Sequence, residues 1–265
     1  MILRTISDFL ESHAPLSYQE SYDNCGLLVG SYDSEIQSAI VCLDVTEEIL
    51  DEAIGSGAEL IIAHHPLIFS GLKRLTGSNY IQRIVEKAIR HQIAIYAIHT
   101  NLDNTLVSGV NSRFAQQLGL LASSPLRADN SPQNVDIPKG IGIIGTLPEP
   151  LTPGDFLAYV KIRMNTNCIR YTPAVADTIS KVAICGGSGS FLLQDAIRLQ
   201  VDAFITGDFK YHDFFDGPGN IMILDIGHYE SEQFTMDLIV SLISEKFSNF
   251  AVRKTKHISN PIKYF

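Results

Sequence analysis

Short, continuous runs of apolar residues alternate with amphipathic stretches along most of the chain. Runs at 60–63, 92–98 and 221–227 lack the polar alternation of a half-exposed strand, so we expect strands that are buried on both faces. Stretches such as 80–91 and 107–118 have helical periodicity instead. This alternation of strands and helices predicts an α/β fold with mixed, largely parallel sheets.

A polar segment separates two such series of elements. Residues 121–139 are rich in Ser, Pro, Asn and Asp, which is typical of a linker between domains. The predicted strands of the second series are 140–147, 181–185 and 201–206. The chain has 265 residues, 45% of them hydrophobic, which is enough for one large domain or for two medium domains with cores of their own.

Histidines and carboxylates follow three of the buried strands. The strand 60–63 ends in His64 and His65, and the other two lead into His99–Asp103 and His228–Glu232. Ligands of α/β sheets bind in the crevice beyond the carboxyl ends of the strands, so we expect these side chains to converge. Adjacent histidines at a strand end can each face their own metal, which favours a dinuclear site.

Five residues make up the predicted ligand set for two divalent ions per subunit: His64, His65, Asp103, His228 and Glu232. His228 and Glu232 are four residues apart, hence on one face of a helix, and Glu232 has two oxygens with which to bridge the ions. Glu230 lies off that face, and we expect it to be solvated. Nitrogen and oxygen ligands suit Zn, Mn, Fe or Co, with open positions for a water activated for hydrolysis.

Two further histidines are candidates for catalytic roles. His99, four residues before Asp103, is either a supporting donor or acid/base in the site, or a satisfied core histidine. His212 and Lys210 follow the strand 201–206, where they either contact an anionic substrate or lie on an exposed loop.

The Gly-rich segment Gly186–Ser190 lies between a predicted strand and a predicted helix. Free backbone N–H groups in such a loop can bind an anion. A tight connection that needs positive φ angles explains the glycines equally well, and both interpretations stay open.

The ligand set also bears on domain organisation, because its C-terminal members must reach those of the first domain. We therefore expect a discontinuous metal-binding domain of residues 1–125 plus 227–265, which includes a helix over 229–247 and a strand over 250–255. The second α/β domain would comprise residues 126–226.

Charge and composition exclude several classes of protein. The net charge of −9 argues against bulk electrostatic binding to nucleic acid. No apolar stretch is long enough to span a bilayer, and the first residues lack the pattern of a signal peptide. The four cysteines have no CxxC spacing, which fits a reduced, cytoplasmic protein.

Five segments together resemble the Nif-three-like family, whose members are often labelled GTP cyclohydrolase I type 2 homologues: 22–30, 63–69, 99–103, 206–212 and 227–232. The resemblance covers nearly the whole chain, although Tyr22 stands where Trp is usual and Cys25 where an aliphatic residue is usual. It implies a two-domain α/β subunit, a toroidal homohexamer, and a dinuclear metal site on the same five ligands.

The family label implies that metal-activated water opens the purine ring of GTP. A metal-dependent phosphoesterase or nucleotide hydrolase is an alternative, because the sequence offers no strong triphosphate site. A non-catalytic, metal-binding hexameric scaffold is a third hypothesis from a different class. Metal-dependent turnover would separate the first two from the third.

Overall fold

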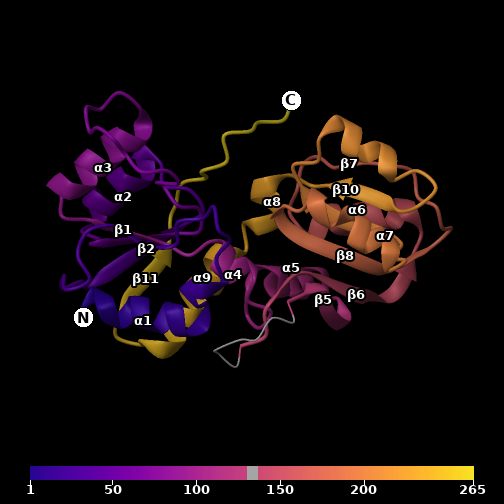
Figure 1. The fold of residues 1–265 in the computed structure, drawn as a ribbon, viewed down its shortest axis with the longest axis horizontal. Helices are drawn as coiled ribbons and strands as arrows, with labels where there is room; N and C mark the ends of the chain where they lie inside the picture. The colour runs from indigo at the N-terminus through magenta and orange to yellow at the C-terminus, as the bar shows by residue number, and fades with distance from the viewer. Residues whose placement is uncertain (130–136) are drawn as a thin grey trace. The chain divides into compact units, whose positions relative to one another are not determined.

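The computed structural model describes residues 1–129 and 137–265 (Figure 1). The chain divides into two compact units, each with a mixed β-sheet and helices. Unit 1 comprises Met1–Leu102 and Thr235–Pro261, and unit 2 comprises Asp103–Phe234 and Ile262–Phe265. The predicted α/β class with mixed, mostly parallel sheets is confirmed.

Unit 1 is built on a five-stranded sheet in the order β1-β4-β3-β2-β11. Its strands are β1 (Gly26–Val29), β2 (Ser38–Cys42), β3 (Leu60–Ala63), β4 (Ala94–Ala97) and β11 (Ala251–Lys254). β1 runs antiparallel to β4, and the remaining neighbours are parallel. The parallel pairing of β3 and β4 brings their carboxyl ends to the same edge of the sheet.

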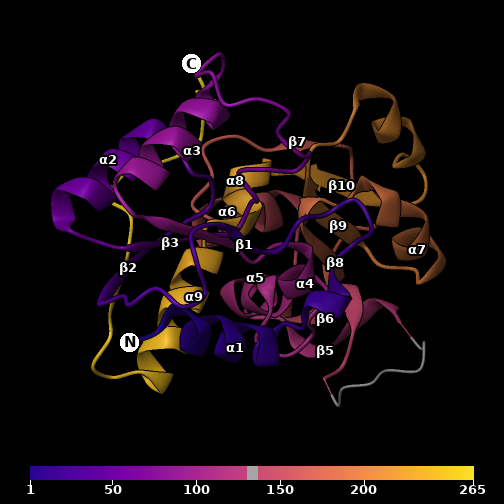
Figure 2. The same ribbon diagram turned by 60° about the vertical axis from the view of Figure 1, so that its left-hand side comes forward.

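Helices cover both faces of this sheet. They are α1 (Leu3–His13), η1 (Leu16–Tyr18), α2 (Glu47–Ser56), α3 (Tyr80–Arg90) and α9 (Thr235–Lys246). Figures 1 and 2 both show α2 and α3 on one face, and α1 and α9 on the other. Ile49 of α2 and Ile84 of α3 pack against Ile40, Ile61 and Ile95 of the strands.

Unit 2 contains a six-stranded sheet in the order β5-β6-β8-β9-β10-β7. The strands are β5 (Leu121–Ala128), β6 (Gly140–Leu151), β7 (Arg170–Tyr171), β8 (Ile179–Ser188), β9 (Ala203–Gly207) and β10 (Met222–Asp225). The helices are α5 (Val110–Leu118), α6 (Pro153–Arg163), η2 (Ser190–Leu192), α7 (Leu193–Arg198), η3 (Tyr211–Asp216) and α8 (His228–Glu232). The short helix α4 (Thr100–Asp103) ends at the first residue of this unit.

Alternate side chains of β8 enter two different cores, as expected for a strand buried on both faces. Val182 and Ile184 pack with Phe114 of α5 and Phe156 of α6. Ala183 and Cys185 pack on the opposite side, with α7. The sheet is therefore the middle layer of an α/β/α unit.

The segment expected to be a linker is partly a strand. Leu121–Ala128 forms β5, which pairs antiparallel with β6 at the edge of the sheet, and residues 130–136 lie outside the described residues. An exposed edge strand tolerates Pro125 and the serines, so its composition resembles that of a loop.

The boundaries expected at residues 125/126 and 226/227 both lie inside unit 2. Helix α5 packs against the sheet of unit 2, which adds residues 103–125 to it. The helix expected over 229–247 is two helices, α8 in unit 2 and α9 in unit 1, separated at Gln233 and Phe234. The expected strand over 250–255 is present as β11.

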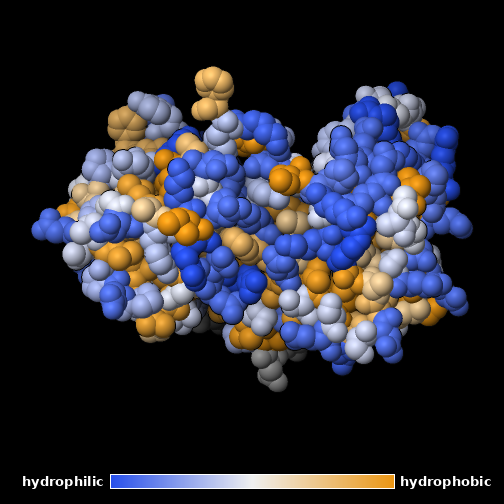
Figure 3. Space-filling model, turned by 180° about the vertical axis from the view of Figure 1, so that it is seen from behind, coloured by the Kyte–Doolittle hydropathy of each residue, from blue (hydrophilic) through white to orange (hydrophobic). Residues whose placement is uncertain are grey.

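The surface of the protein is mixed in hydropathy. One face of the molecule is largely hydrophilic, with hydrophobic residues in small groups between the polar ones (Figure 3). Among the described residues, no helix has both the length and the apolar character needed to cross a membrane.

Candidate metal-binding site

Three histidines meet at the carboxyl edge of the sheet in unit 1. His64 and His65 follow β3 directly, and His99 follows β4, the parallel neighbour of β3. One ring nitrogen from each of the three lies within 4.8 Å of the others. Their ring centroids are 4.9 to 5.3 Å apart. These three imidazoles form a group that could hold a metal ion.

The Nδ1 atoms of His64 and His65 face hydrogen-bond acceptors. His64 Nδ1 lies 2.9 Å from the carbonyl oxygen of Ile98, and His65 Nδ1 lies 2.8 Å from Asp44 Oδ1. The other oxygen of Asp44 accepts a hydrogen bond from Ser259 Oγ at 2.8 Å. An acceptor at Nδ1 requires that this nitrogen carries the proton of the neutral ring. The lone pair then lies on Nε2, as it does in histidines that bind a metal through that atom.

His99 is held in the same way by Asp23. The distance from His99 Nδ1 to Asp23 Oδ1 is 2.9 Å, and the other oxygen of Asp23 accepts from the backbone N–H of Thr100 at 3.0 Å. Burial alone would raise the pKa of Asp23, but the hydrogen bonds from His99 and Thr100 outweigh it and hold that pKa well below its usual range. Asp23 therefore stays ionised and fixes the His99 ring.

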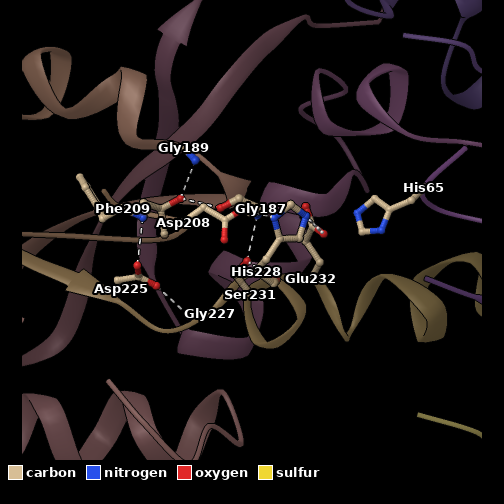
Figure 4. A network of polar contacts seen from close by, with 12 residues as sticks. His65, Gly187, Gly189, Asp208, Phe209, Asp225, Gly227, His228, Ser231 and Glu232 are labelled. Carbon is tan, nitrogen blue, oxygen red and sulfur yellow. Dashed lines mark hydrogen bonds and ion pairs between the residues drawn. The ribbon is translucent and has the colours of Figure 1, made fainter. Parts of the chain in front are cut away.

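A second group of candidate ligands lies in unit 2. His228 and Glu232 are the first and last residues of α8, and His228 Nε2 is 3.1 Å from Glu232 Oε2, as their spacing predicted. His228 Nδ1 lies 2.7 Å from Asp208 Oδ2, so the ring sits between two carboxylates (Figure 4). Burial disfavours the charged form of the ring and lowers its pKa. The two carboxylates favour the charged form more strongly, and they raise the pKa of His228 to about 11.

Asp225 holds together the two loops that carry Asp208 and His228. One of its oxygens accepts from the backbone N–H of Phe209 at 2.9 Å, and the other from that of Gly227 at 3.0 Å (Figure 4). These two residues directly follow Asp208 and directly precede His228. A buried carboxylate at the end of β10 thus sets the spacing of the His228–Asp208 pair.

Asp103 belongs to unit 2 as the last residue of α4. Its backbone carbonyl accepts a hydrogen bond from Asn111 Nδ2 at 3.1 Å. Burial and the nearby charges of Asp103 and Glu232 raise the pKa of the Cys185 thiol, so both carboxylates lie close to the end of β8. The thiol itself is buried and protonated, as expected for a core cysteine.

The Gly-rich segment is a tight connection whose amides are already bonded. The backbone N–H groups of Gly186, Gly187 and Gly189 donate to Asn111 Oδ1, Ser231 Oγ and Thr206 Oγ1 at 2.8 to 3.0 Å. These bonds contradict the interpretation of the loop as an open anion site. Gly187 has a φ of +64°, and a Cβ there would overlap Glu232 Oε1. Gly187 therefore makes room for the Glu232 carboxylate.

Replacing Gly187 with alanine should displace Glu232 and destabilise the fold. We expect a loss of about 1–2 kcal/mol from the positive φ alone, with weaker metal binding in addition. Thermal unfolding and a metal titration would measure both effects. Gly154→Ala is the matched control, because nothing lies within 4 Å of a Cβ at that position. Unchanged metal binding in Gly187→Ala would contradict this role.

The structure shows the surroundings of two further residues, one of which agrees with an alternative given above: an exposed position for His212. His212 is exposed on η3, where its ring stacks on Phe215 with a centroid distance of 6.0 Å and an angle of 27°. Glu230, expected to be solvated, is only 8% exposed, so that expectation was wrong. Its carboxylate lies against the turn at Gly227, where a Cβ would overlap it.

The carboxylates that hold the histidines were missed from the sequence. Asp44 is 21 residues from His65, Asp208 is 20 from His228, and Asp23 is 76 from His99. Each lies just after a strand or in a turn, so nothing local links it to its histidine. The available signal was that acidic residues follow several strand ends, as histidines do.

Comparison with known proteins gives the group to which the chain belongs. A model of the Duf34/NIF3 (NGG1p interacting factor 3) family matches residues 1–261. The chain belongs to the Duf34/NIF3 family. This agrees with the family resemblance that the sequence motifs indicated.

Curated relatives of this Duf34/NIF3 protein carry the name GTP cyclohydrolase 1 type 2 homolog. The relative from Clostridium perfringens is 33% identical over 266 residues, and that from Campylobacter jejuni is 32% identical over 272 residues. Both matches cover 100% of each chain.

Solved structures show the same fold. A hypothetical protein from Staphylococcus aureus has a TM-score of 0.91 at 31% identity, and a Bacillus cereus protein related to NIF3 has 0.91 at 25%. Each match covers 100% of this chain and 99% of the other.

In this Duf34/NIF3 protein, replacing Asp208 with asparagine should weaken metal binding about 10- to 100-fold, the usual cost of losing a carboxylate that orients a metal-binding histidine. The amide keeps the size of the side chain but not the charge that stabilises a donating Nδ1. Asp213→Asn, on the nearby helix η3, is a control of the same chemistry. Competition with a chromophoric chelator would measure the metal affinity of both variants. An unchanged affinity in Asp208→Asn would contradict the role of Asp208 in orienting His228.

Proposed function

We propose that this protein binds two divalent ions of Zn, Mn, Fe or Co and is a metal-dependent hydrolase. The proposed ligands are His64, His65, Asp103, His228 and Glu232. One observation carries the proposal: every histidine of the two groups has Nδ1 on an oxygen acceptor, and three of the four acceptors are carboxylates. Histidines prepared in this way are typical of metal centres, and the support comes from each unit separately.

The donor set fits such ions. It contains imidazole nitrogens and carboxylate oxygens and no thiolate, which suits borderline and hard divalent metals. Bound divalent ions would supply Lewis acidity and activate water for hydrolysis at neutral pH. Glu232, which is buried and has two oxygens, is the proposed bridge between the ions. Asp208 and Asp44 keep the Nδ1 protons in place on His228 and His65.

Two substrates are candidates for this hydrolase. The name of the curated relatives suggests opening of the purine ring of GTP. The amides of Gly186, Gly187 and Gly189, however, already donate to protein side chains, so these three do not form a triphosphate cradle. That observation favours the alternative, a phosphoesterase or nucleotide hydrolase that does not need to hold a triphosphate.

A substrate screen tests the proposal. Protein stripped of metal and reloaded with Zn, Mn, Fe or Co would be incubated with GTP and a panel of phosphoesters, with products read by mass spectrometry. We expect turnover that needs metal and is lost in His65→Ala. Tight metal binding without turnover of any substrate would support a non-catalytic metal-binding scaffold instead.

His99→Gln should lower turnover while leaving most of the metal in place. The reason is that Asp23 fixes the ring beside His64 and His65, where it can support the site without serving as a ligand. Metal content and turnover measured on one preparation decide the role. Metal lost in step with activity would make His99 a ligand, and full activity would make it a structural histidine.

We also propose that the chain assembles into a toroidal homohexamer in the cytoplasm, as its family resemblance implies. Native mass spectrometry should give six times the mass of the 29.2 kDa chain. The four cysteines are free thiols, which fits a reducing compartment. A monomer or dimer at micromolar concentration would contradict the hexamer.

A further inference from the structure

A cavity of about 380 Å³ lies in unit 2, beside β7 and η3. Its lining includes Arg170, Tyr171, Pro173, Tyr211, Phe214 and Phe215. β7 is the edge strand next to β10 (Figure 2). Because Arg170 and Tyr171 of β7 line the cavity, it lies at this edge of the sheet. The volume falls at the lower end of the range for small-molecule sites, which is roughly 300–1,000 Å³. It therefore suits a ligand the size of a nucleoside.

Three aromatic side chains of the lining are exposed to an unusual degree. Tyr211 is 72% exposed, Phe215 65% and Tyr171 55%. Tyr211 and Phe215 contact each other edge to face, with centroids 5.4 Å apart, and the His212 ring stacks on Phe215. The exposed fractions show that much of both the Tyr211 and the Phe215 side chain remains open to a ligand. Large aromatic rings are normally buried, and rings that lie open around a cavity are typical platforms for planar ligands.

Arg170 supplies a polar edge without an excess of charge. Its guanidinium donates to the carbonyl oxygen of Phe209 at 2.9 Å and forms an ion pair with the buried Asp225. The guanidinium carbon also lies 5.4 Å from the ring centre of Phe214. Because Asp225 compensates its charge, Arg170 favours a neutral ring with hydrogen-bond acceptors over a phosphate group.

The same carboxylate connects this cavity with the candidate metal site. Asp225 accepts from Arg170 and also from the amides of Phe209 and Gly227, which flank the Asp208–His228 pair. A ligand in contact with Arg170 would thus be separated from the loops that carry this pair by a single side chain.

We propose that this cavity binds the purine ring of a nucleoside or nucleotide, stacked on Phe215, bordered by Tyr211 and hydrogen-bonded at its edge by Arg170. The binding site stands on the geometry of unit 2 alone. Its assignment as the place where a hydrolase substrate is held rests on the proposed function.

The chain contains no tryptophan, so a single introduced one reports on its own position. Tyr211→Trp keeps a stacking ring in the cavity. Phe191→Trp is the matched control, because Phe191 is also exposed, lies in unit 2 and has an arginine over its ring, but does not line the cavity. Both variants would be titrated with guanosine, adenosine and ribose, in chelator and then with metal.

We expect saturable quenching of Tyr211→Trp by guanosine or adenosine in the absence of metal, and only shallow, linear quenching of Phe191→Trp. Adding Phe215→Ala to Tyr211→Trp should weaken the binding of the purine about 5- to 150-fold, which is the cost of losing one stacking partner. Phe215 is exposed, so the fold should survive, and circular dichroism would check this.

Equal, unsaturable quenching in both tryptophan variants would overturn the proposal. So would a change in sedimentation without purine binding, which would identify these aromatics as a contact between copies of the chain. Purine binding that persists in a protein without any turnover would leave this site standing and refute the proposed hydrolase. Turnover of phosphoesters without purine binding would support the proposed hydrolase and refute the purine site.

Discussion

Replacing Glu232 with glutamine should remove both divalent ions from the protein and abolish metal-dependent turnover. The side chain is 3% exposed and its Oε2 lies 3.1 Å from His228 Nε2, so the amide fits the space but cannot bridge two cations. We expect metal content to fall from about two ions per chain towards none, and turnover to fall on the order of 100-fold or more.

Elemental analysis of the purified variant measures the first effect, and the substrate screen the second. Glu245→Gln, an exposed position on α9, is the matched control and should keep its metal. A full complement of metal in Glu232→Gln would rule out the role of Glu232 as the bridge between the ions. Loss of one ion only would mean that Glu232 serves a single metal.

Metal affinity should rise steeply with pH. In the metal-free protein the pKa of His228 is raised to about 11, so the ring is protonated at neutral pH and must lose that proton to bind a metal. Below this pKa, each pH unit should tighten binding about tenfold, which gives roughly a 100-fold gain between pH 6 and pH 8. The sign follows from competition, because protons and metal occupy the same nitrogen.

Titrations with a chelator of known affinity at several pH values would test this dependence, and calorimetry in buffers of different ionisation enthalpy would count the released protons. In His228→Gln, metal binding should release one proton fewer, so the affinity should change less steeply with pH. His13→Gln, at the end of α1, is the control and should not alter it. A pH-independent affinity in the unmodified protein would remove His228 from the ligand set.

Local sequence patterns were sufficient where burial and chain direction decide the structure. Continuous apolar runs predicted β3, β4 and β10, because a strand covered on both faces has no polar alternation. The i, i+4 spacing predicted the contact of His228 with Glu232. The same patterns failed for β5, whose exposed edge position leaves a polar, Pro-containing composition.

The sequence by itself determined the α/β class, the family and the histidines and carboxylates at the strand ends. Only the tertiary structure decided where α8 and α9 separate, how the Gly-rich loop is bonded, and which carboxylate holds each histidine. Asp23, Asp44 and Asp208 reach their histidines across 20 to 76 residues of chain. Such pairs depend on the order of strands in a sheet, and that order is set by the packing of the whole core rather than by neighbouring residues.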